Sequence, residues 1–319
     1  MTPQSALEAE ALAFDRRIEE RVKAGFVPDL RRMVKCDYFY KSFWRDPHFV
    51  RLYLGAIVDR YLELIHQHAG DGASILDVGC GAGYVALELA RAGHHVTGID
   101  ISGSCIDIAR KTAESDPHLS GFGSLEYHTL PLDEAEGAYD VVLFSGCLHH
   151  FHHVEGAVRR AVDLVTTDGH LLCLEPCHEQ WREADAAQVA LIRSLLSLTG
   201  FWYESPEELN ISGDPDDLLH HIHDIHDEYL LERDKHEVGQ SPNDNASSGK
   251  QILHALRAHL SELVYQPMFS FLLRTLGGMR GPDDRVHRIA DFLAAYDRLG
   301  VERGFLRPNS FIFMGRRTR

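Results

Sequence analysis

The sequence has no long apolar stretch, no cysteine pair at C-x-x-C spacing and no run of more than two basic residues. Without a long apolar stretch, a helix that crosses a bilayer is not expected. The charged N-terminus has no apolar core of a signal peptide. The six cysteines show no disulfide-framework spacing, which favours a reduced, cytoplasmic protein. A formal net charge of −16 with scattered basic residues argues against binding to a phosphate backbone, so no nucleic-acid partner and no membrane are expected.

The order of apolar patterns predicts an α/β fold. Residues 1–68 have helical periodicity, and a helix is expected to start after Asp46-Pro47. From Ala69, short apolar runs alternate with amphipathic helices, which is typical of a mostly parallel, Rossmann-like sheet with helices on both faces. The expected strands are Ser74–Val78, His95–Ile99, Ser124–His128, Asp140–Ser145 and His170–Glu175.

The remainder of the chain predicts a long insertion before one last strand. Helices are expected over Glu179–Leu198, Lys250–Leu276 and Asp283–Leu299, and Gly239–Gly249 has the composition of an exposed, mobile loop. Ser310–Gly315 is expected to return to the sheet as a strand. We therefore divide the chain into a helical N-terminal cap (1–68), a cofactor-binding core (69–178), a helical insertion (179–306) and the last strand (307–319).

A glycine-rich loop follows the first expected strand. Gly79, Gly81 and Gly83 alternate with other residues and lead into a helix at Tyr84, a pattern that allows the backbone to approach a ligand closely. The dinucleotide pattern G-x-G-x-x-G is not met because Tyr84 replaces its third glycine. Asp77 would repel a pyrophosphate and attract an ammonium or sulfonium. A turn without a ligand is the structural alternative, and a nicotinamide dehydrogenase is disfavoured.

Further segments follow in the order of a known family. The next strand ends with Gly98-Ile99-Asp100, which puts an acid where ribose hydroxyls can be bound. The combination D-x-G-x-G-x-G and G-x-D resembles class I S-adenosylmethionine-dependent methyltransferases. The resemblance extends to Tyr139–Leu143 with Ser145 at the strand end, to Leu148–Phe151 and to Gly169–Pro176, and so covers about residues 74–176.

The resemblance implies a cofactor, S-adenosyl-L-methionine, and a set of residues that bind it. In this family Gly79, Gly81 and Gly83 would cradle the methionine moiety with Asp77 near its ammonium. Asp100 would bind the ribose, and Ser145 would border the same site. Many relatives carry an acid beside the adenine after the third strand, whereas this chain reads Tyr127-His128-Thr129. The activity implied is methyl transfer to an oxygen or nitrogen of a small-molecule acceptor, and we expect this acceptor to belong to specialised metabolism.

Histidine is abundant, with 21 residues, and two clusters are candidates for function. His149 and His150 follow the fourth strand at its carboxyl end, where either could act as general base in methyl transfer. A structural or substrate-contacting role fits the same position, and the residues do not choose between the two histidines. A metal is not expected there, although a metal-dependent enzyme and a non-catalytic cofactor-binding protein are alternative functions. The second cluster, His220–Asp227, favours a solvated helix face over a metal site.

The aromatic segment Cys36–Trp44 has two interpretations. As core, it would pack the N-terminal helices onto the sheet. As a lid, it would cover the sulfonium, because aromatic faces attract cations. The hydroxyls of Tyr38 and Tyr40 need polar partners when buried, so we predict these two residues as contacts of the acceptor. Asp140 is expected to cap the start of its strand, away from the site.

Overall fold

A seven-stranded sheet forms the centre of the molecule in the computed structural model, which describes residues 3–116, 120–230 and 241–317. Its strand order is β3-β2-β1-β4-β5-β7-β6. All neighbouring strands are parallel except β7, which is antiparallel to both β5 and β6. The strands are β1 (Ser74–Val78), β2 (His95–Asp100), β3 (Ser124–Thr129), β4 (Tyr139–Ser145), β5 (Val165–Pro176), β6 (Leu260–Met268) and β7 (Ser310–Arg317).

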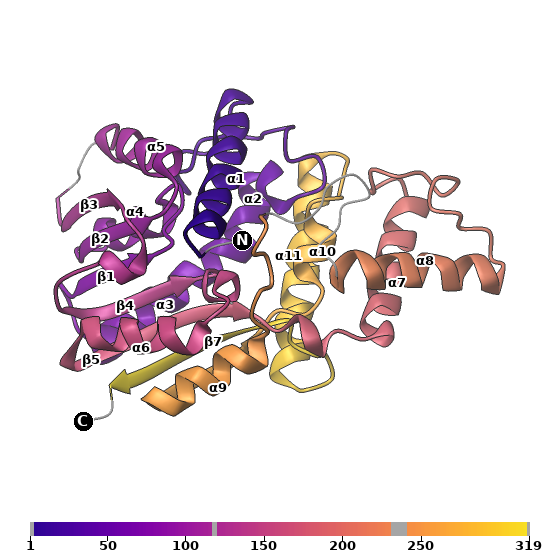
Figure 1. The fold of residues 1–319 in the computed structure, drawn as a ribbon. Helices are drawn as coiled ribbons and strands as arrows, with labels where there is room; N and C mark the ends of the chain where they lie inside the picture. The colour runs from indigo at the N-terminus through magenta and orange to yellow at the C-terminus, as the bar shows by residue number, and fades with distance from the viewer. Residues whose placement is uncertain (1–2, 117–119, 231–240, 318–319) are drawn as a thin grey trace.

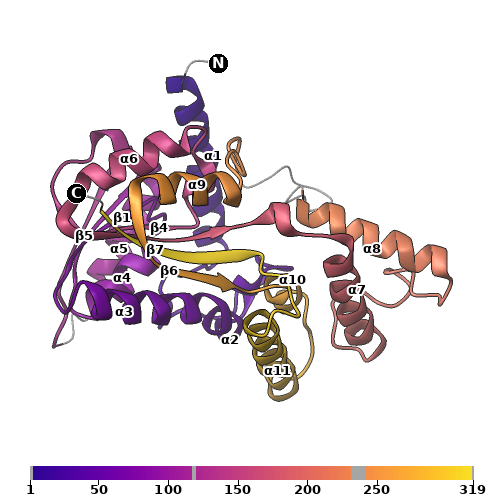
Figure 2. The same cartoon turned by 90° about the horizontal axis from the view of Figure 1, so that it is seen from below.

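Helices cover both faces of the sheet, as the apolar strand composition predicted. One face carries α3 (Ala56–His68), α4 (Tyr84–Arg91) and α5 (Gly103–Glu114), and the other carries α6 (Val154–Leu164) and α9 (Gly249–His259) (Figure 2). Two apolar clusters fill the spaces between the sheet and these layers. The central strands β1 and β4 contribute side chains to both clusters, because alternate residues of a strand point to opposite faces. The Rossmann-like α/β prediction is confirmed.

The N-terminal region is helical, as expected. Helix α1 (Pro3–Lys23) packs against α5 beside the sheet (Figure 1). Helix α2 (Pro47–Val50) begins after Asp46, whose side chain accepts a hydrogen bond from the His48 amide at 2.8 Å, and runs through one π-helical turn into α3. An aspartate cap followed by proline at the first helical position favours a helix start.

A buried ion network fixes the N-terminal region to the core. The Arg91 guanidinium from α4 donates to both carboxylate oxygens of Asp29 at 2.8 Å and to Asp116 at 2.6 Å. Asp29 is fully buried and the Arg91 side chain is 7% exposed. Because Asp29 precedes the aromatic segment, the network determines where that segment meets the core.

The insertion forms a helical lobe beyond the sheet. Helices α7 (Glu183–Leu198) and α8 (Pro215–Leu230) lie at the end of the molecule away from β3, with α10 (Leu272–Leu276) and α11 (Asp283–Glu302) nearer the sheet (Figure 1). Among the described residues, no helix combines the length and apolarity needed to span a bilayer.

One predicted helix is wrong. The segment Lys250–Leu276 was expected to be helical throughout, but α9 ends at His259 and Leu260–Met268 forms the edge strand β6. Among the described strands it pairs only with β7, and an edge strand is the place in a sheet where a proline such as Pro267 is tolerated. The open edge of β7 stabilises the extended conformation over a helix that the local sequence also permits. The last strand, β7, is confirmed and extends to Arg317.

Candidate active site

The glycine loop turns at the carboxyl end of β1 with all three glycines in the left-handed region. Their φ angles are 68° at Gly79, 53° at Gly81 and 80° at Gly83. A Cβ at Gly79 would lie 2.3 Å from the Cys147 sulfur, and one at Gly83 would lie 2.4 Å from the Tyr127 hydroxyl. Around Gly81, by contrast, no atom lies within 4 Å of such a Cβ. Gly81 therefore borders open space, as a residue that cradles a ligand would.

Asp77, at the end of β1, is a buried acid that needs a partner. Its side chain is 1% exposed, and neither carboxylate oxygen has a hydrogen-bond partner among the described residues. Burial and the nearby Asp100 raise the pKa of Asp77 to about 8. An isolated buried carboxylate is costly unless a cation or donor satisfies it. The site thus fits a ligand that brings a positively charged group to Asp77.

Asp100, at the end of β2, lies beside the same loop. Its carboxylate accepts hydrogen bonds from the amides of Gly81 and Ser102, each at 2.8 Å. Burial raises the pKa of Asp100, although these two amides oppose the shift. Ser145, at the end of β4, accepts a hydrogen bond from the hydroxyl of the fully buried Tyr61 at 3.1 Å. The predicted cofactor residues therefore gather at one edge of the sheet, while the role of each stays a prediction.

His149 is held by a buried carboxylate in the turn after β4. Its Nδ1 lies 2.8 Å from Glu175 at the end of β5, and Glu175 also accepts from the amides of Cys147 and Leu148. Because a carboxylate only accepts, Nδ1 carries the proton and Nε2 is the basic nitrogen. That Nε2 lies 3.8 Å from Asp244. An imidazole that donates one nitrogen to a buried carboxylate and keeps the other basic is suited to act as a general base.

His150 makes a different set of contacts, with α1. Its Nδ1 lies 3.0 Å from the Glu10 carboxylate, and the Phe14 ring meets its ring edge-on at 5.5 Å. Glu10 also accepts hydrogen bonds from the Ser241 hydroxyl and the Asn243 amide. Glu10 therefore connects three segments: its own helix α1, the turn after β4 that carries His149 and His150, and residues 241–243.

The expectation of an exposed loop at Gly239–Gly249 is partly wrong. Gly239 and Gln240 lie outside the described residues, but Ser247 is 3% exposed. The Ser247 amide donates to the His149 carbonyl and its hydroxyl donates to the Phe151 carbonyl. Glycine, serine and asparagine indicate turns, but composition does not reveal that the turns pack against the histidines.

Four acidic residues of the site were missed by sequence reasoning. Glu175 stands in the Glu-Pro pair at the strand end, where it was noted only as a mark of the fold. Glu10, Asp15 and Asp244 belong to segments that no local pattern connects to the site. The Asp15 carboxylate accepts from the Ser102 hydroxyl at 2.6 Å and from the Ser104 amide, so it binds the loop after Asp100.

Two groups of side chains within the described residues have a spacing that a metal ion could use. His149, His150 and Asp244 each place one ligand atom within 4.8 Å of the others. The second group is Asp46, Asp283 and His287, where the Lys35 ammonium already lies 2.5 Å from Asp283 and 3.4 Å from Asp46. The segment His220–Asp227 lies in α8 (Pro215–Leu230), where His221 is 9% exposed and His220, Asp224 and Asp227 line a cavity, so this face is only partly the solvated one that was predicted.

The predicted acceptor contacts Tyr38 and Tyr40 lie at the surface, 43% and 52% exposed. Between them Phe39 is buried, and the Trp44 ring meets Tyr84, the residue after the glycine loop, at 5.1 Å. Cys36, Phe39 and Phe43 therefore belong to the core and Trp44 packs against it. The Tyr38 hydroxyl donates to Glu20 at 3.2 Å.

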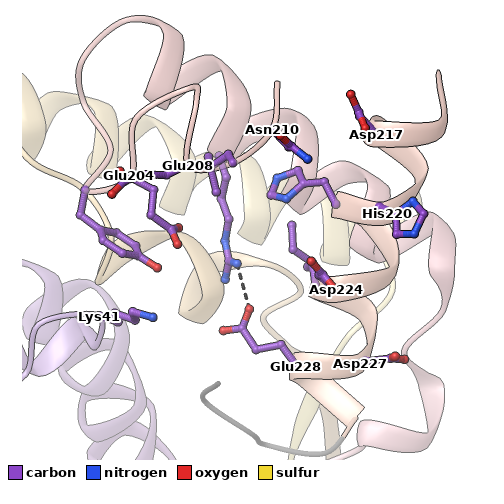
Figure 3. Close-up of a pocket in the computed structure, with 14 residues that line it drawn as sticks. Lys41, Glu204, Glu208, Asn210, Asp217, His220, Asp224, Asp227 and Glu228 are labelled. Carbon is purple, nitrogen blue, oxygen red and sulfur yellow. Dashed lines mark hydrogen bonds and ion pairs between the residues drawn. The ribbon is translucent and has the colours of Figure 1, made fainter. Parts of the chain in front are cut away.

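Tyr40 leads to a cavity in the insertion. Its ring packs edge-on against Tyr203 at 5.4 Å, and Tyr203 lines a cavity of about 450 Å³ between α7 and α8. Figure 3 shows Lys41, Glu204 and Glu228 directed toward this cavity. The remaining lining residues are Arg193, Glu208, Leu209, Asn210, Asp217, His220, His221, Asp224, Ile225 and Asp227. Six of the 14 lining residues are acidic, and Arg193 is paired with Glu228 at 3.0 Å. A role of Tyr40 in acceptor binding stays a prediction.

Comparison with known proteins agrees with the Rossmann-like fold and with the glycine loop after β1. A family described as a methyltransferase domain matches residues 48–211, just over half of the chain. The chain belongs to this family. With its glycine loop and sheet order it is a class I, S-adenosylmethionine-dependent member, as the sequence predicted.

Curated relatives match part of this chain. The ubiquinone biosynthesis O-methyltransferase of Acinetobacter baylyi is 32% identical over 134 residues, 40% of this chain and 55% of the relative. That of Bordetella avium is 36% identical over 135 residues, 40% of this chain and 53% of the relative. The match thus spans about half the length of these relatives. The structure of magnesium protoporphyrin IX methyltransferase from Synechocystis PCC 6803 with bound SAH has a TM-score of 0.53, 13% identity and coverage of 97% of this chain and 98% of the other, which shows a shared fold.

Proposed function

We propose that this chain transfers the methyl group of S-adenosylmethionine to an oxygen or nitrogen of a small acceptor that lies beside His149 and His150. The observation that carries the proposal is the unpartnered Asp77 beside the open space at Gly81, in a loop whose Gly79 packs against Cys147, two residues before the histidine held by Glu175. The names of the curated relatives favour oxygen as the methylated atom. The helical lobe of the insertion lies outside the cofactor-binding core, and a lobe of this kind is compatible with an acceptor from specialised metabolism.

The cofactor, when bound, supplies an electrophilic methyl group on a sulfonium. In the proposed site, Asp77 binds the ammonium of the cofactor and Asp100 binds its ribose hydroxyls. Gly81 leaves room for the part of the cofactor that connects these two groups. The glycine amides and the start of α4 border the same space. These residues orient the donor and exclude water, which accounts for much of the rate gain in a displacement of this kind.

For the acceptor, His149 is the better placed base of the pair. Glu175 fixes its ring and its tautomer, so Nε2 can accept the acceptor proton as the methyl group is transferred. Glu175 is fully buried and would stabilise the resulting imidazolium. His150 is engaged through Nδ1 with Glu10 and through its ring with Phe14, which suits a role in closing the site.

Single substitutions separate these roles. With an identified acceptor, His149→Ala should lower kcat by about a hundredfold or more and leave cofactor affinity nearly intact. The fall in rate at acidic pH, caused by imidazole protonation, should disappear in that variant. His150→Ala should retain the shape of the pH profile. If both variants keep full activity, the histidine assignment is wrong and the cofactor assignment stands.

A metal-dependent reaction is a second candidate because His149, His150 and Asp244 have metal-ligand spacing. A bound divalent ion would take the acceptor oxygen as a ligand and lower its pKa. Metal analysis of the purified protein, with activity measured before and after chelation, tests this candidate. Activity that is unchanged after complete removal of metal rejects it.

A further inference from the structure

Helix α7 carries apolar side chains on its outer face as well as on its inner face. On the outer face, Leu191, Leu195 and Leu198 are 59%, 55% and 58% exposed. The apolar residues on its buried side are Ala186, Val189, Ala190 and Leu196. A helix that is apolar on both sides is typical of a position that is covered on both sides. The outer face of α7 therefore has the composition of a contact surface.

The three exposed leucines form one stripe along the helix, which we call the leucine stripe. Steps of four and three residues place them on the same side of α7 at successive turns. A single exposed leucine is ordinary on a protein surface, but this spacing is the one with which the seam of a helix pair repeats. The helix belongs to the lobe at the end of the molecule away from β3 (Figure 1), and more than half of each leucine is accessible there.

The leucine stripe lies in a segment that is almost free of charge. Between Ala186 and Tyr203 the sequence has one charged residue, Arg193. Its side chain is directed inward, since it is 10% exposed, lies 3.0 Å from Glu228 and donates to the Arg274 carbonyl. Two copies that each have a formal net charge of −16 repel each other where their carboxylates meet, and a neutral face avoids this repulsion. An acidic or basic partner would gain no ion pair from the same face.

We propose that two copies of this chain pair through the leucine stripe, with their α7 helices antiparallel about a twofold axis near Leu195. In this arrangement Leu195 lies beside its own counterpart, and Leu191 lies beside Leu198 of the partner subunit. A twofold interface uses the same patch on both copies, so the patch must be complementary to itself. An uncharged stripe with a leucine on either side of a central leucine meets this condition. The pairing goes beyond the proposed function, which needs the cofactor edge of a single copy.

The small size of the leucine stripe predicts a reversible dimer. Helix α8 packs against α7 and exposes two more leucines in the same lobe, Leu218 and Leu219, at 51% and 43%. A standard interface buries about 800 Å² on each partner. An interface with three leucines of each copy at its centre is small on that scale. We therefore expect a dimer that dissociates on dilution.

Sedimentation equilibrium of the full chain between about 1 and 100 µM tests the pairing, because small interfaces dissociate in this range. The average mass should rise with concentration from 35.9 kDa toward twice that value. Leu195→Arg should keep the mass of one copy throughout, since it places two like charges at the axis. Phe292→Arg is the matched control, because Phe292 is 66% exposed on α11, outside the leucine stripe. This variant should dimerise like the wild type.

A cysteine at the axis gives a second measurement that does not depend on how the arginine variant folds. In Leu195→Cys, a short bis-maleimide should link two copies, because a residue near a twofold axis lies beside its own counterpart. Five of the six native cysteines are buried, and Phe292→Cys and the wild type should stay unlinked. A wild-type mass of one copy at every concentration overturns the proposal, as does a dimer that persists in Leu195→Arg. Equal cross-linking of the two cysteine variants also overturns it, because it indicates random encounters.

Discussion

Replacement of Asp77 by asparagine should stabilise the ligand-free protein while it weakens cofactor binding. Asp77 is 1% exposed and has no hydrogen-bond partner among the described residues. Burial and Asp100 raise its pKa from 3.8 to about 8, so the folded protein binds a proton that the unfolded chain releases. A carboxyl group whose pKa is raised by folding lowers stability progressively as the pH rises from the unfolded to the folded value.

The size of the effect follows from the two pKa values. At 1.36 kcal/mol for each pKa unit, the raised pKa of Asp77 lowers the free energy of unfolding by about 4 kcal/mol at pH 7 and by about 1–2 kcal/mol at pH 5. The buried amide of Asp77→Asn has its own cost of about 1–3 kcal/mol, but that cost does not depend on pH. The free energy of unfolding of Asp77→Asn, relative to that of the wild type, should therefore increase by about 2–3 kcal/mol between pH 5 and pH 7.

Urea unfolding at the two pH values measures this change directly. Asp133→Asn, at an exposed carboxylate, is the control and should show no growth of the difference with pH. S-adenosylhomocysteine should bind Asp77→Asn about ten- to a hundredfold more weakly at pH 7 because the ammonium loses its charged partner. A stability difference that is the same at both pH values would refute the reasoning, and so would unchanged affinity.

Three further outcomes are expected. Gly81→Val should abolish S-adenosylhomocysteine binding in calorimetry because the added side chain fills the open space. The control is Gly72→Val, at a similar φ of 67° and also with no atom within 4 Å of a Cβ. It should share the backbone strain and keep the affinity. Arg91→Met should lower the free energy of unfolding in urea by about 3–5 kcal/mol because it strands buried carboxylates; a loss below about 1 kcal/mol would contradict this. Burial lowers the pKa of both His94 and His170, so stability should fall as the pH drops below about 6.5, where the unfolded chain takes up protons more readily. The double variant with glutamine at both positions should flatten that acidic limb in thermal unfolding, and an unaltered limb would exclude these histidines as its cause.

Local patterns were sufficient for the core. Strand β1 has the predicted bounds and α4 begins at the predicted Tyr84, because an apolar run, three glycines and an amphipathic helix each have a strong local preference. Asp140 lies at the start of its strand β4, as expected, but its carboxylate accepts from the amide and hydroxyl of Ser74 at the start of the neighbouring β1. Position in the chain alone put Asp77 and Asp100 at the carboxyl edge of a parallel sheet.

Only the tertiary structure decided the rest of the site. Helix α9 and β6 form one continuous apolar pattern in the sequence, and the free edge of β7 determines where the helix stops. His149 and His150 are equivalent in the sequence, but Glu175 comes to one and Glu10 to the other.

The physical reason is that secondary structure depends on preferences within a few residues, whereas these contacts join residues 26 and 140 positions apart. No periodicity encodes a partner at such a distance. The packing of the helical layers on the sheet decides which distant residues become partners. This packing brings α1, the turn with His149 and His150, and residues 241–247 to the edge of the sheet where the glycine loop lies.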